Sequence, residues 1–446
     1  MFGLYGLLLR LAWAVVLPYQ IVMARLQGEQ APPFLERLAR HPALGESRAG
    51  GFWVHAVSVG EVRLALTVIA GLRRRMPGLP IHLTTCTRTG RALATEAIRS
   101  DDPGRPDSVS DLPLDLPGPV GRLLDHLRPQ ALVIIETELW PNLIRISGDR
   151  RVPVFVVNGR ISERSFPRYR WLRPLLVRSL PRAALFVMQS ADDAARLATL
   201  GAPAHQIVIG GNLKFDLPAP RVDANEVRRR IGASPEEAVL VAGSTARGEE
   251  DAVLGAFAAL RRVRPISRLV LAPRHPEDLQ AAREASRRAG LRLLRWSEIA
   301  AGTTSAPQPY DVLLVDVVGV LPEVYAAATL AFVGGSLVPR GGQNLLEPAA
   351  QGKPVLFGPH VENFRAAARD LGAQGGGFMA RDPSDLAALV LRLAGDKAAL
   401  DAAGASARRV VEANRGALTR TLDYLEAALR VPPSLCASTG HAAART

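Results

Sequence analysis

The chain has few of the residues and motifs that mark several common protein classes. Its 446 residues include only two cysteines, Cys86 and Cys436, at a spacing that suits no zinc site. This scarcity favours a reducing compartment and predicts no structural zinc. No GxGxxG follows a first strand with an acidic residue about 20 positions later, and no GxxxxGK[ST] occurs, which argues against dinucleotide oxidoreductases and P-loop NTPases. The sequence also contains no internal repeat and no low-complexity block.

The charge balance is strongly positive. Lys and Arg total 55 against 42 Asp and Glu, which gives a net charge of +13, and arginine supplies nearly all of the cations. Such a surplus predicts an anionic partner: nucleic acid, an anionic lipid surface or a phosphorylated substrate. A hydrophobic content of 48% in a chain of this length predicts a globular protein with two domains of about 150–220 residues each.

The first 23 residues are almost entirely apolar. As a helix they would be about 35 Å long, close to the thickness of the hydrocarbon core of a bilayer. Arg10 would cost about 2.5–3.5 kcal/mol at the bilayer centre, so a transmembrane span, a tilted or interfacial anchor and a buried first helix all stay open. No basic residue precedes the apolar run, which argues against a cleaved signal peptide. Arg25, Arg37 and Arg40 follow it, and the positive-inside rule then places the rest of the chain in the cytoplasm.

From Gly51 onward, short apolar runs alternate with stretches of helical periodicity. The predicted strands of the first half are 52–57, 81–85, 131–136, 154–158, 184–189 and 207–210. After a connector that contains prolines, the predicted strands are 239–243, 268–273, 291–295, 311–315, 330–333 and 354–357. Continuously apolar strands that alternate with helices predict α/β domains, each with a parallel sheet covered on both faces.

These patterns predict the organisation of the chain. Two Rossmann-like domains would face a cleft between the carboxyl ends of two sheets, where open α/β sheets bind ligands. The predicted segments are a membrane anchor (1–26), a first α/β domain (27–217), a linker (218–227), a second α/β domain (228–430) and a disordered tail (431–446).

The segment HAVSVGE (55–61) joins a predicted strand to a predicted helix. Ser58 and Glu61 have the spacing of a capping box, in which the two side chains would only stabilise the start of the helix. The alternative is that Glu61 lies at the mouth of a site as a general base, and the nearby helix amino terminus would favour its ionised form. Both interpretations can hold for one residue.

Two further segments of the first half carry candidate groups. In VIIETELWPN (133–142), strand geometry would point Glu136 and Glu138 the same way, and two carboxylates that close would raise one pKa unless cations separate them. The simpler interpretation pairs each carboxylate with an arginine. Lys214 in GNLKF (211–215) most simply is a solvated surface lysine, and its place at the predicted domain junction is the reason to consider more.

Residues 160–182 form a basic segment. They contain seven arginines together with Trp171 and several aliphatic residues. A basic surface with apolar side chains predicts contact with a membrane or a lipid. The alternative is an ordinary solvated helix face.

Four segments of the second half place small, hydroxyl or cationic residues at predicted strand ends. They are GSTARGEE (243–250), PRHP (273–276), GGS (334–336) and RGGQNLLE (340–347). Backbone N–H groups and hydroxyls at such loops suit a phosphate. Asn344 and Glu347 also have capping spacing, so a local structural role competes. Together the four segments predict an anionic, nucleotide-like ligand.

The motifs taken together resemble those of the 3-deoxy-D-manno-oct-2-ulosonic acid (Kdo) transferases, which glycosylate the lipid A precursor. The segments that carry the resemblance are WVHAVSVGE (53–61), PLDLPGPVGR (113–122), IETELWPNLI (135–144), VNGRISERS (157–165), GNLKFD (211–216), AGSTARGEE (242–250), LAPRHPE (271–277) and VGGSLVPRGGQNLLEPAAQGKPVLFGP (333–359). The resemblance implies a GT-B fold and an inverting transfer of Kdo from CMP-Kdo to the lipid A precursor, lipid IVA. It implies no metal or other cofactor and no nucleic-acid partner. It also implies an enzyme on the cytoplasmic side of the bacterial inner membrane, whose first domain binds the acceptor and whose second binds the nucleotide sugar.

Carried over residue by residue, the resemblance makes Glu61 the general base, and Glu136 and Lys214 the groups that stabilise the transition state. The implied contacts with CMP-Kdo are Pro273, Arg274, Val318, Gly319, Val320, Asn344, Leu345, Leu346 and Glu347. Glu138 is then expected to position its loop or an arginine. Three positions depart from the family pattern: Gln343 and Ala246 stand where His is frequent, and Val320 stands where Glu is frequent. These departures put a donor contact in question.

Two other functions remain as alternatives. A different GT-B transferase or epimerase with a UDP-sugar donor would share the fold, but not HAVSVGE together with ETELWPN. A basic membrane protein that binds anionic lipid without catalysis would not need the intact Glu61.

Overall fold

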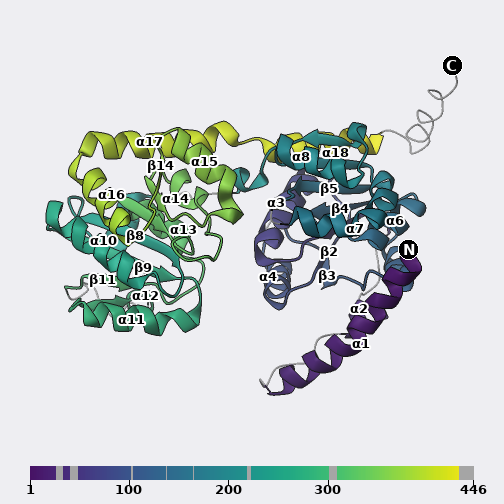
Figure 1. Cartoon of the computed structure of the whole chain (residues 1–446), viewed down its shortest axis with the longest axis horizontal. Coiled ribbons are helices and arrows are strands. Elements are labelled where there is room, and N and C mark those ends of the chain that lie inside the picture. The colour runs from purple at the N-terminus through teal and green to yellow at the C-terminus, as the bar shows by residue number, and fades with distance from the viewer. Residues whose placement is uncertain are drawn as a thin grey trace. The chain divides into compact units, whose positions relative to one another are not determined.

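The computed structural model describes residues 1–26, 34–40, 49–101, 104–136, 138–163, 165–217, 222–300 and 309–430 (Figure 1). The chain divides into two compact units, one of Met1–Leu217 with the segment from Gly416 onward, and one of Pro218–Arg415. Helix α18 (Ala417–Arg430) therefore belongs to the first unit, and its predicted place in the second domain was wrong. Leu422 and Leu425 of α18 are buried in the core of the first unit, so apolar burial decides the assignment.

The first unit contains a seven-stranded parallel sheet in the order β3-β2-β1-β4-β5-β6-β7. The strands are β1 (Phe52–His55), β2 (Ile81–Thr85), β3 (Ser108–Asp111), β4 (Ala131–Ile135), β5 (Val154–Gly159), β6 (Leu185–Met188) and β7 (Ile207–Ile209). His55 of β1 lies in register with Thr84 of β2 on one side and Ile134 of β4 on the other. The chain order reverses between β1 and β4, and open α/β sheets bind ligands beside the carboxyl ends of the strands at such a point.

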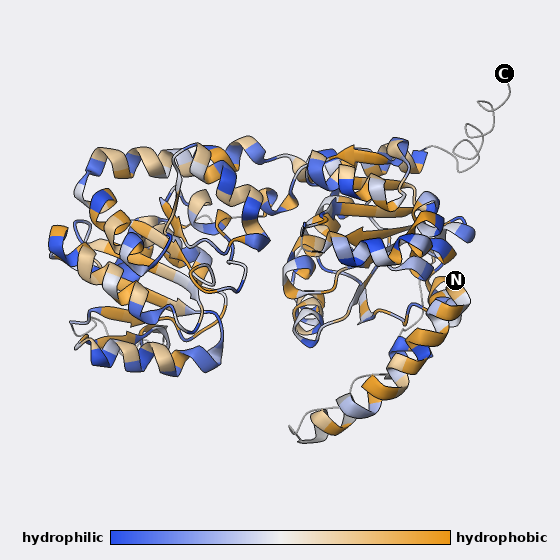
Figure 2. Ribbon diagram, viewed as in Figure 1, coloured by the Kyte–Doolittle hydropathy of each residue, from blue (hydrophilic) through white to orange (hydrophobic). Residues whose placement is uncertain are grey.

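Helices cover both faces of this sheet. The helices of this unit are α1 (Phe2–Leu26), α2 (Phe34–Arg37), α3 (Val59–Arg75), α4 (Arg88–Arg99), α5 (Pro117–Leu127), α6 (Pro141–Asp149), α7 (Phe166–Ser179), α8 (Ala191–Leu200) and α18. Side chains of α5, α6, α7 and α8 form one core with Trp53 and Leu132. Those of α3 and α18 form a second core with Val54 and Val133 on the opposite side. Alternate residues of one strand thus serve two cores, and Figure 2 shows the strands largely in the hydrophobic colour.

The second unit repeats this architecture. Its parallel sheet has the order β10-β11-β9-β8-β12-β13-β14, so its order reverses between β8 and β12. The strands are β8 (Ala238–Thr245), β9 (Ser267–Pro273), β10 (Leu293–Arg295), β11 (Val312–Leu314), β12 (Leu330–Val333), β13 (Val355–Phe357) and β14 (Gly377–Met379). The helices are α9 (Ala224–Arg230), α10 (Glu250–Val263), α11 (Leu279–Arg288), α12 (Trp296–Ala300), α13 (Leu321–Val324), α14 (Leu346–Ala350), α15 (Arg365–Ala373), α16 (Pro383–Gly395) and α17 (Lys397–Asn414). They again pack on both faces.

The predicted alternation of strands and helices is confirmed, with three differences. The sequence analysis missed β3, an edge strand that contains two serines and an aspartate, and β14, a strand of only three residues. The predicted linker 218–227 was too long, because α9 begins at Ala224 behind a cap in which the Asp223 carboxylate accepts a hydrogen bond from the Asn225 N–H (2.9 Å). Residues 218–221 and the predicted tail, 431–446, lie outside the described residues.

Candidate functional site

Glu61 lies in the first turn of α3, directly after β1, where the chain order of the first sheet reverses. The Ser58 hydroxyl caps the helix: it accepts a hydrogen bond from the Glu61 N–H (3.4 Å) and donates one to Oε1 of Glu61 (2.9 Å). The Val57 N–H donates to Oε2 (2.8 Å). The predicted capping box is therefore present, and it holds both carboxylate oxygens of Glu61 in a defined position.

Burial raises the pKa of Glu61 above its ordinary value. The Val57 N–H and the Ser58 hydroxyl lower this pKa, while the negative charge of Glu136 raises it and the positive charge of Lys214 lowers it. The effects that raise the pKa of Glu61 outweigh those that lower it, so the expectation that the helix start would favour the ionised form was wrong in its net direction. The helix contribution is local, whereas loss of water around a carboxylate penalises its charge strongly. A carboxylate with a raised pKa is a stronger base once it is deprotonated.

Glu136 and Lys214 form an ion pair beside Glu61. Nζ of Lys214 lies 3.0 Å from Oε1 of Glu136, and both side chains are about four-fifths buried, with 17% and 21% exposed. Glu136 has a positive φ of 59°, so strand geometry ends at Ile135. Glu136 and Glu138 were expected to point the same way only if the strand continued through both, and it does not. The Glu136 N–H still donates to the Val157 carbonyl (2.9 Å), which fixes the residue to the neighbouring strand.

Lys214 reaches this pair from a short 3-10 helix, Leu213–Asp216, that follows β7. The Asn212 side chain accepts the Lys214 N–H (3.0 Å), and Oδ1 of Asn158, at the end of β5, accepts the Leu213 N–H (2.9 Å). The Asp216 carboxylate accepts the N–H groups of Gly416 and Leu418 at the start of α18. Segments far apart in the sequence thus hold Lys214 against Glu136, and its interpretation as a solvated lysine was wrong.

Glu138 is a third carboxylate in the same electrostatic environment. Burial, followed by the negative charges of Glu61 and Glu136, raises the pKa of Glu138 to about 7. Burial, followed by the negative charges of Glu138 and Glu61, raises the pKa of Tyr169 to about 12. Among the described residues, no ion pair joins Glu138 to an arginine. The expected role of positioning an arginine therefore finds no support. The spacing of the carboxylates in ETE signalled this site, but Tyr169 carried no such signal.

The residues implied as donor contacts lie on loops at the carboxyl ends of the second sheet. Pro273 ends β9, and the N–H of Arg274 donates to the Thr245 carbonyl (2.8 Å), while its side chain is exposed. Val318 is 92% exposed on the loop after β11, and Gly319 has a φ of 97° that favours glycine. Val320 precedes α13 and packs partly against the core.

The segment 344–347 begins α14. Nδ2 of Asn344 donates to Oε1 of Glu347 (3.1 Å), and Oδ1 of Asn344 accepts the Leu346 N–H (3.1 Å). The predicted local capping role is therefore present. Leu345 and Leu346 are buried, so any ligand contact of these two residues would use their backbone. Among the residues that the structure describes, no group of three or more His, Cys, Asp or Glu is placed to hold a metal ion.

Glu249 is a functional candidate that the sequence analysis did not single out. Its side chain is fully buried between the β8–α10 and β12–α14 loops. Oε2 accepts the N–H groups of Ala246 (2.8 Å) and Gly335 (2.7 Å), and Oε1 accepts those of Ser336 (3.0 Å) and Leu337 (2.8 Å). Three of these amides, those of Ala246, Gly335 and Ser336, lie in segments expected to suit a phosphate, and that expectation was wrong for them, because a carboxylate of the chain itself already occupies them.

Comparisons with known proteins identify the family of the chain. A family model described as 3-deoxy-D-manno-octulosonic-acid transferase (kdotransferase) matches residues 33–217. The chain is 37% identical to the 3-deoxy-D-manno-octulosonic acid transferase of Bordetella pertussis, over 95% of this chain and 98% of that protein. The chain belongs to the Kdo transferase family. The Kdo transferase of Haemophilus influenzae is 34% identical over 92% of this chain and 95% of its own length. This member of the Kdo transferase family is therefore a glycosyltransferase.

Solved structures show which fold the Kdo transferase has. HepE of Anabaena, in complex with UDP and glucose, is similar with a TM-score of 0.56 over 85% of this chain and 99% of that chain, at 15% identity. The UDP-GlcNAc 2-epimerase of Neisseria meningitidis gives a TM-score of 0.53 over 85% of this chain and 100% of that chain, at 12% identity. Such low identity shows the fold alone, and the fold is GT-B, as predicted.

Helix α1 of the Kdo transferase lies against the first unit along one face. The Tyr5 hydroxyl donates to the buried Asp115 (2.9 Å), the guanidinium of Arg145 lies 4.7 Å from the Phe2 ring centre, and that of Arg37 lies 5.2 Å from the Trp13 ring centre. The large apolar residues exposed on α1 are Leu4, Leu7, Leu8, Leu11, Val15, Val16, Tyr19 and Val22. Most of the apolar window 2–19 is exposed, so the alternative of a buried first helix was wrong.

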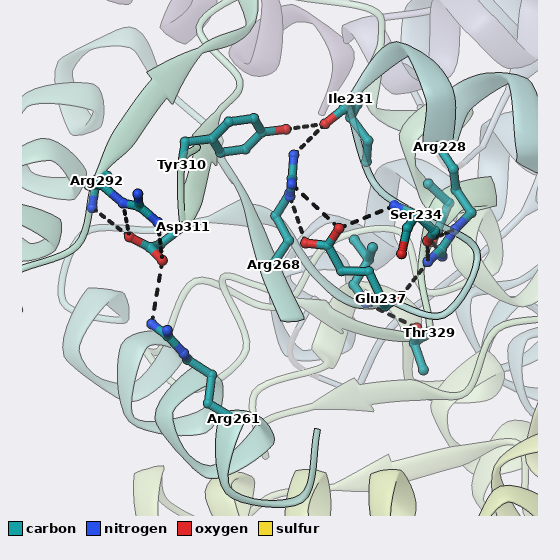
Figure 3. Close-up of polar contacts among 12 residues, drawn as sticks. Arg228, Ile231, Ser234, Glu237, Arg261, Arg268, Arg292, Tyr310, Asp311 and Thr329 are labelled. Atoms are coloured by element: carbon teal, nitrogen blue, oxygen red, sulfur yellow. Dashed lines mark hydrogen bonds and ion pairs between the residues drawn. The ribbon is translucent and has the colours of Figure 1, made fainter. Parts of the chain in front are cut away.

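An extensive polar network in the second unit lies at the opposite edge of the sheet, at the amino ends of the strands (Figure 3). Arg268, early in β9, donates to Oε1 of Glu237 (2.9 Å) and to the Ile231 carbonyl (2.6 Å), and its guanidinium lies 4.0 Å from the Tyr310 ring centre. The Tyr310 hydroxyl donates to the same carbonyl. The residues implied as donor contacts lie at the other edge of the sheet, and the Arg268–Glu237 pair of this network is buried, so we assign the network a structural role.

Replacing Arg268 with Met is expected to lower the free energy of unfolding of the second unit by about 3–5 kcal/mol, because Glu237 would keep its charge in a buried position without its ion-pair partner. Arg268 and Glu237 are only 11% and 9% exposed. Urea unfolding measures the loss. The matched control is Arg288→Met, whose pair with Asp251 is 62% and 86% exposed, and which should change stability by at most about 0.5 kcal/mol. Equal small losses in both variants would contradict the assignment.

Proposed function

We propose that this Kdo transferase moves Kdo from CMP-Kdo to the lipid A precursor, lipid IVA, with inversion at the anomeric carbon and with Glu61 as the general base. The observation that carries the proposal is the position of Glu61 beside the Glu136–Lys214 ion pair at the point where the first sheet reverses its order. The 37% identity with a Kdo transferase over nearly the whole chain supports the choice of sugar.

In the proposed reaction the 6-hydroxyl of a glucosamine of the acceptor attacks the anomeric carbon of Kdo. Glu61 takes the hydroxyl proton as the new C–O bond forms, and the C–O bond to the CMP phosphate breaks, with its electron pair leaving on the phosphate. Positive charge develops on the sugar in the transition state, and the Glu136 carboxylate stabilises it. Lys214 holds Glu136 in place and offsets negative charge on the Kdo carboxylate or the departing phosphate.

The second unit would bind the nucleotide sugar through the loops that carry Pro273, Arg274, residues 318–320 and residues 344–347. The exposed guanidinium of Arg274 is the cation of this set, and arginine suits a phosphate because its N–H groups form a planar fork. Glu249 occupies the nearby backbone amides, which leaves the phosphate to Arg274 rather than to a loop of N–H groups.

Contact with the cytoplasmic surface of the bacterial inner membrane would come from α1 and α7. The exposed apolar side chains of α1 recur every three to four positions, as on a helix that lies in the membrane interface. Its other face is fastened to the first unit by Tyr5 and Trp13, which favours an interfacial anchor over a span. Trp171 on the arginine-rich α7 is 87% exposed and would add a second contact.

The test is incubation of the purified full chain with CMP-Kdo and tetra-acylated lipid A precursor, with UDP-sugars supplied in parallel. Release of CMP together with the mass gain of Kdo on the lipid is the expected result. Absence of both would overturn the proposal, and release of UDP with transfer of its sugar would favour the alternative of a UDP-sugar enzyme.

Replacing Lys214 with Met is expected to lower kcat by about 10²–10³-fold, because it removes a positive charge from the reacting centre and leaves Glu136 unpaired. In the native protein the positive charge of Lys214 lowers the pKa of Glu61, so its removal should raise that pKa and move the acidic limb of the pH–rate profile to higher pH. Lys214→Arg should restore part of the rate. The control Lys397→Met, in an exposed pair with Asp401, should leave both the rate and the profile unchanged. A Lys214→Met enzyme of normal rate would exclude the electrostatic role.

A further inference from the structure

A groove of about 480 Å³ lies between α1 and the body of the first unit. Most of its lining is apolar and includes Trp13 and Leu17 of α1, together with Leu114 and Leu116 of the segment that joins β3 to α5. Its volume lies in the range of about 300–1,000 Å³ that is usual for ligand sites. The groove is separate from the exposed apolar side chains of α1, which lie on other faces of that helix.

Two arginines line this otherwise apolar groove. Arg122 of α5 is held in place by hydrogen bonds from Nε (3.0 Å) and Nη2 (2.6 Å) to the Leu38 carbonyl. Arg10 of α1 is exposed, and the structure shows it no ion pair or hydrogen bond to any of the residues described. An apolar channel bordered by guanidinium groups is complementary to a molecule that has a hydrocarbon chain next to a phosphate.

The groove borders the same edge of the sheet as Glu61. Trp13, in the groove lining, lies against the guanidinium of Arg37, which donates to the Cys86 carbonyl after β2 (3.1 Å). The threonine hydroxyls on either side of Cys86 each donate to the Val57 carbonyl (3.0 Å). The N–H of Val57 in turn donates to Glu61 (2.8 Å). A continuous series of contacts therefore connects the groove with the proposed base.

We propose that this groove binds one acyl chain of the glycolipid acceptor, with Arg10 and Arg122 beside a phosphate of the same molecule. The inference rests on the proposed function, because it assigns a binding site to the acceptor of that reaction. The series of contacts that connects the groove with Glu61 is the reason to choose the acceptor over a bilayer phospholipid. Each methylene that leaves water for the groove contributes about fourfold in affinity.

The experiment fills the groove with Ala14→Trp and compares it with Ala12→Trp. Ala14 lines the groove, whereas Ala12 is exposed on the same helix outside the lining, so both variants carry the same substitution. Steady-state kinetics of the full chain use two acceptors: the tetra-acylated lipid A precursor and its deacylated, water-soluble counterpart that keeps both phosphates. Ala14→Trp should raise KM for the acylated acceptor at least tenfold with little change in kcat, and should leave KM for the deacylated acceptor unchanged. Ala12→Trp should match the wild type with both.

Further measurements distinguish the glycolipid acceptor from a bilayer phospholipid as the occupant of the groove. Arg10→Gln should raise KM for the acylated acceptor several-fold, and removal of the phosphates from that acceptor should abolish this effect. Flotation with vesicles of phosphatidylethanolamine and phosphatidylglycerol should find equal binding for Ala14→Trp and Ala12→Trp. Loss of vesicle binding in Ala14→Trp with unchanged acceptor KM would assign the groove to bilayer phospholipid and overturn the proposal. An unchanged KM for both acceptors would overturn it too, whereas a wild-type enzyme that transfers Kdo to neither acceptor would overturn the proposed function instead.

Discussion

Glu61→Gln is expected to lower kcat/KM by about 10²–10⁴-fold, the usual contribution of a general base, while the protein stays folded. Glutamine has nearly the same shape, and its amide oxygen can still accept a hydrogen bond from the Val57 N–H or the Ser58 hydroxyl, so most of the helix cap survives. The control is Glu96→Gln on α4, an exposed carboxylate of the same unit, which should leave the rate unchanged. If Glu61→Gln kept most of the activity, Glu61 would be a helix-capping residue and no more.

The pH dependence gives the same variant a second readout. Because burial and the charge of Glu136 raise the pKa of Glu61, the rate should fall with decreasing pH at a higher pH than the ordinary value of about 4.3 for Glu would give. The stability effect has the opposite sign to that of a salt-bridged carboxylate. A raised pKa in the folded state means that the contribution of Glu61 to stability is present at low pH and is lost as pH rises through that pKa. Glu61→Gln should make the free energy of unfolding depend less steeply on pH. Glu138→Gln should weaken this dependence further, because the pKa of Glu138 in the native protein is raised to about 7.

The sequence predicted the fold well because strands and helices depend on local patterns. The apolar runs that became β1 and β4 are buried on both faces, and this burial makes them recognisable without a partner strand. The edge strand β3 has a polar composition, so its strand character comes only from pairing with β2. The membership of α18 depends on which core its apolar face meets, which no local pattern records.

The sequence singled out three residues that the structure brings together, Glu61, Glu136 and Lys214, but it did not indicate their contacts. Glu61 and Glu136 follow strands and carry charges that packing does not explain, so their positions indicated function. The pairing of Lys214 with Glu136 depends on Asn158 and Asp216, which hold the 3-10 helix from two directions. The net pKa of Glu61 depends on how much water the folded chain excludes. Both are consequences of tertiary structure.

Glu249→Gln is expected to destabilise the second unit by about 3 kcal/mol or more. Hydrogen bonds to a charged group contribute about 1.5–3 kcal/mol each, and the variant places an amide NH₂ against two backbone N–H donors while the other oxygen loses its charge. There is little room for readjustment: a Cβ on Gly334 would lie 2.7 Å from Oε2 of Glu249 and 2.4 Å from the Cα of Thr245. Urea unfolding measures the effect, with Glu250→Gln as the control, because the exposed bond that Glu250 accepts is one of 2.7 Å from the Gly248 N–H in the same loop.

The same variant tests how the donor is recognised. Glu249 fastens the β8–α10 loop to the β12–α14 loop, so its loss should raise the Kd for CMP-Kdo at least tenfold under conditions where the variant is still folded, as titration calorimetry would measure. If the four amides were a phosphate site that Glu249 merely blocks, the variant would bind CMP-Kdo more tightly, because a negative charge would be gone. Weaker binding in Glu249→Gln together with weaker binding in Arg274→Ala would therefore place the phosphate on the arginine, with the buried carboxylate positioning the loops around it.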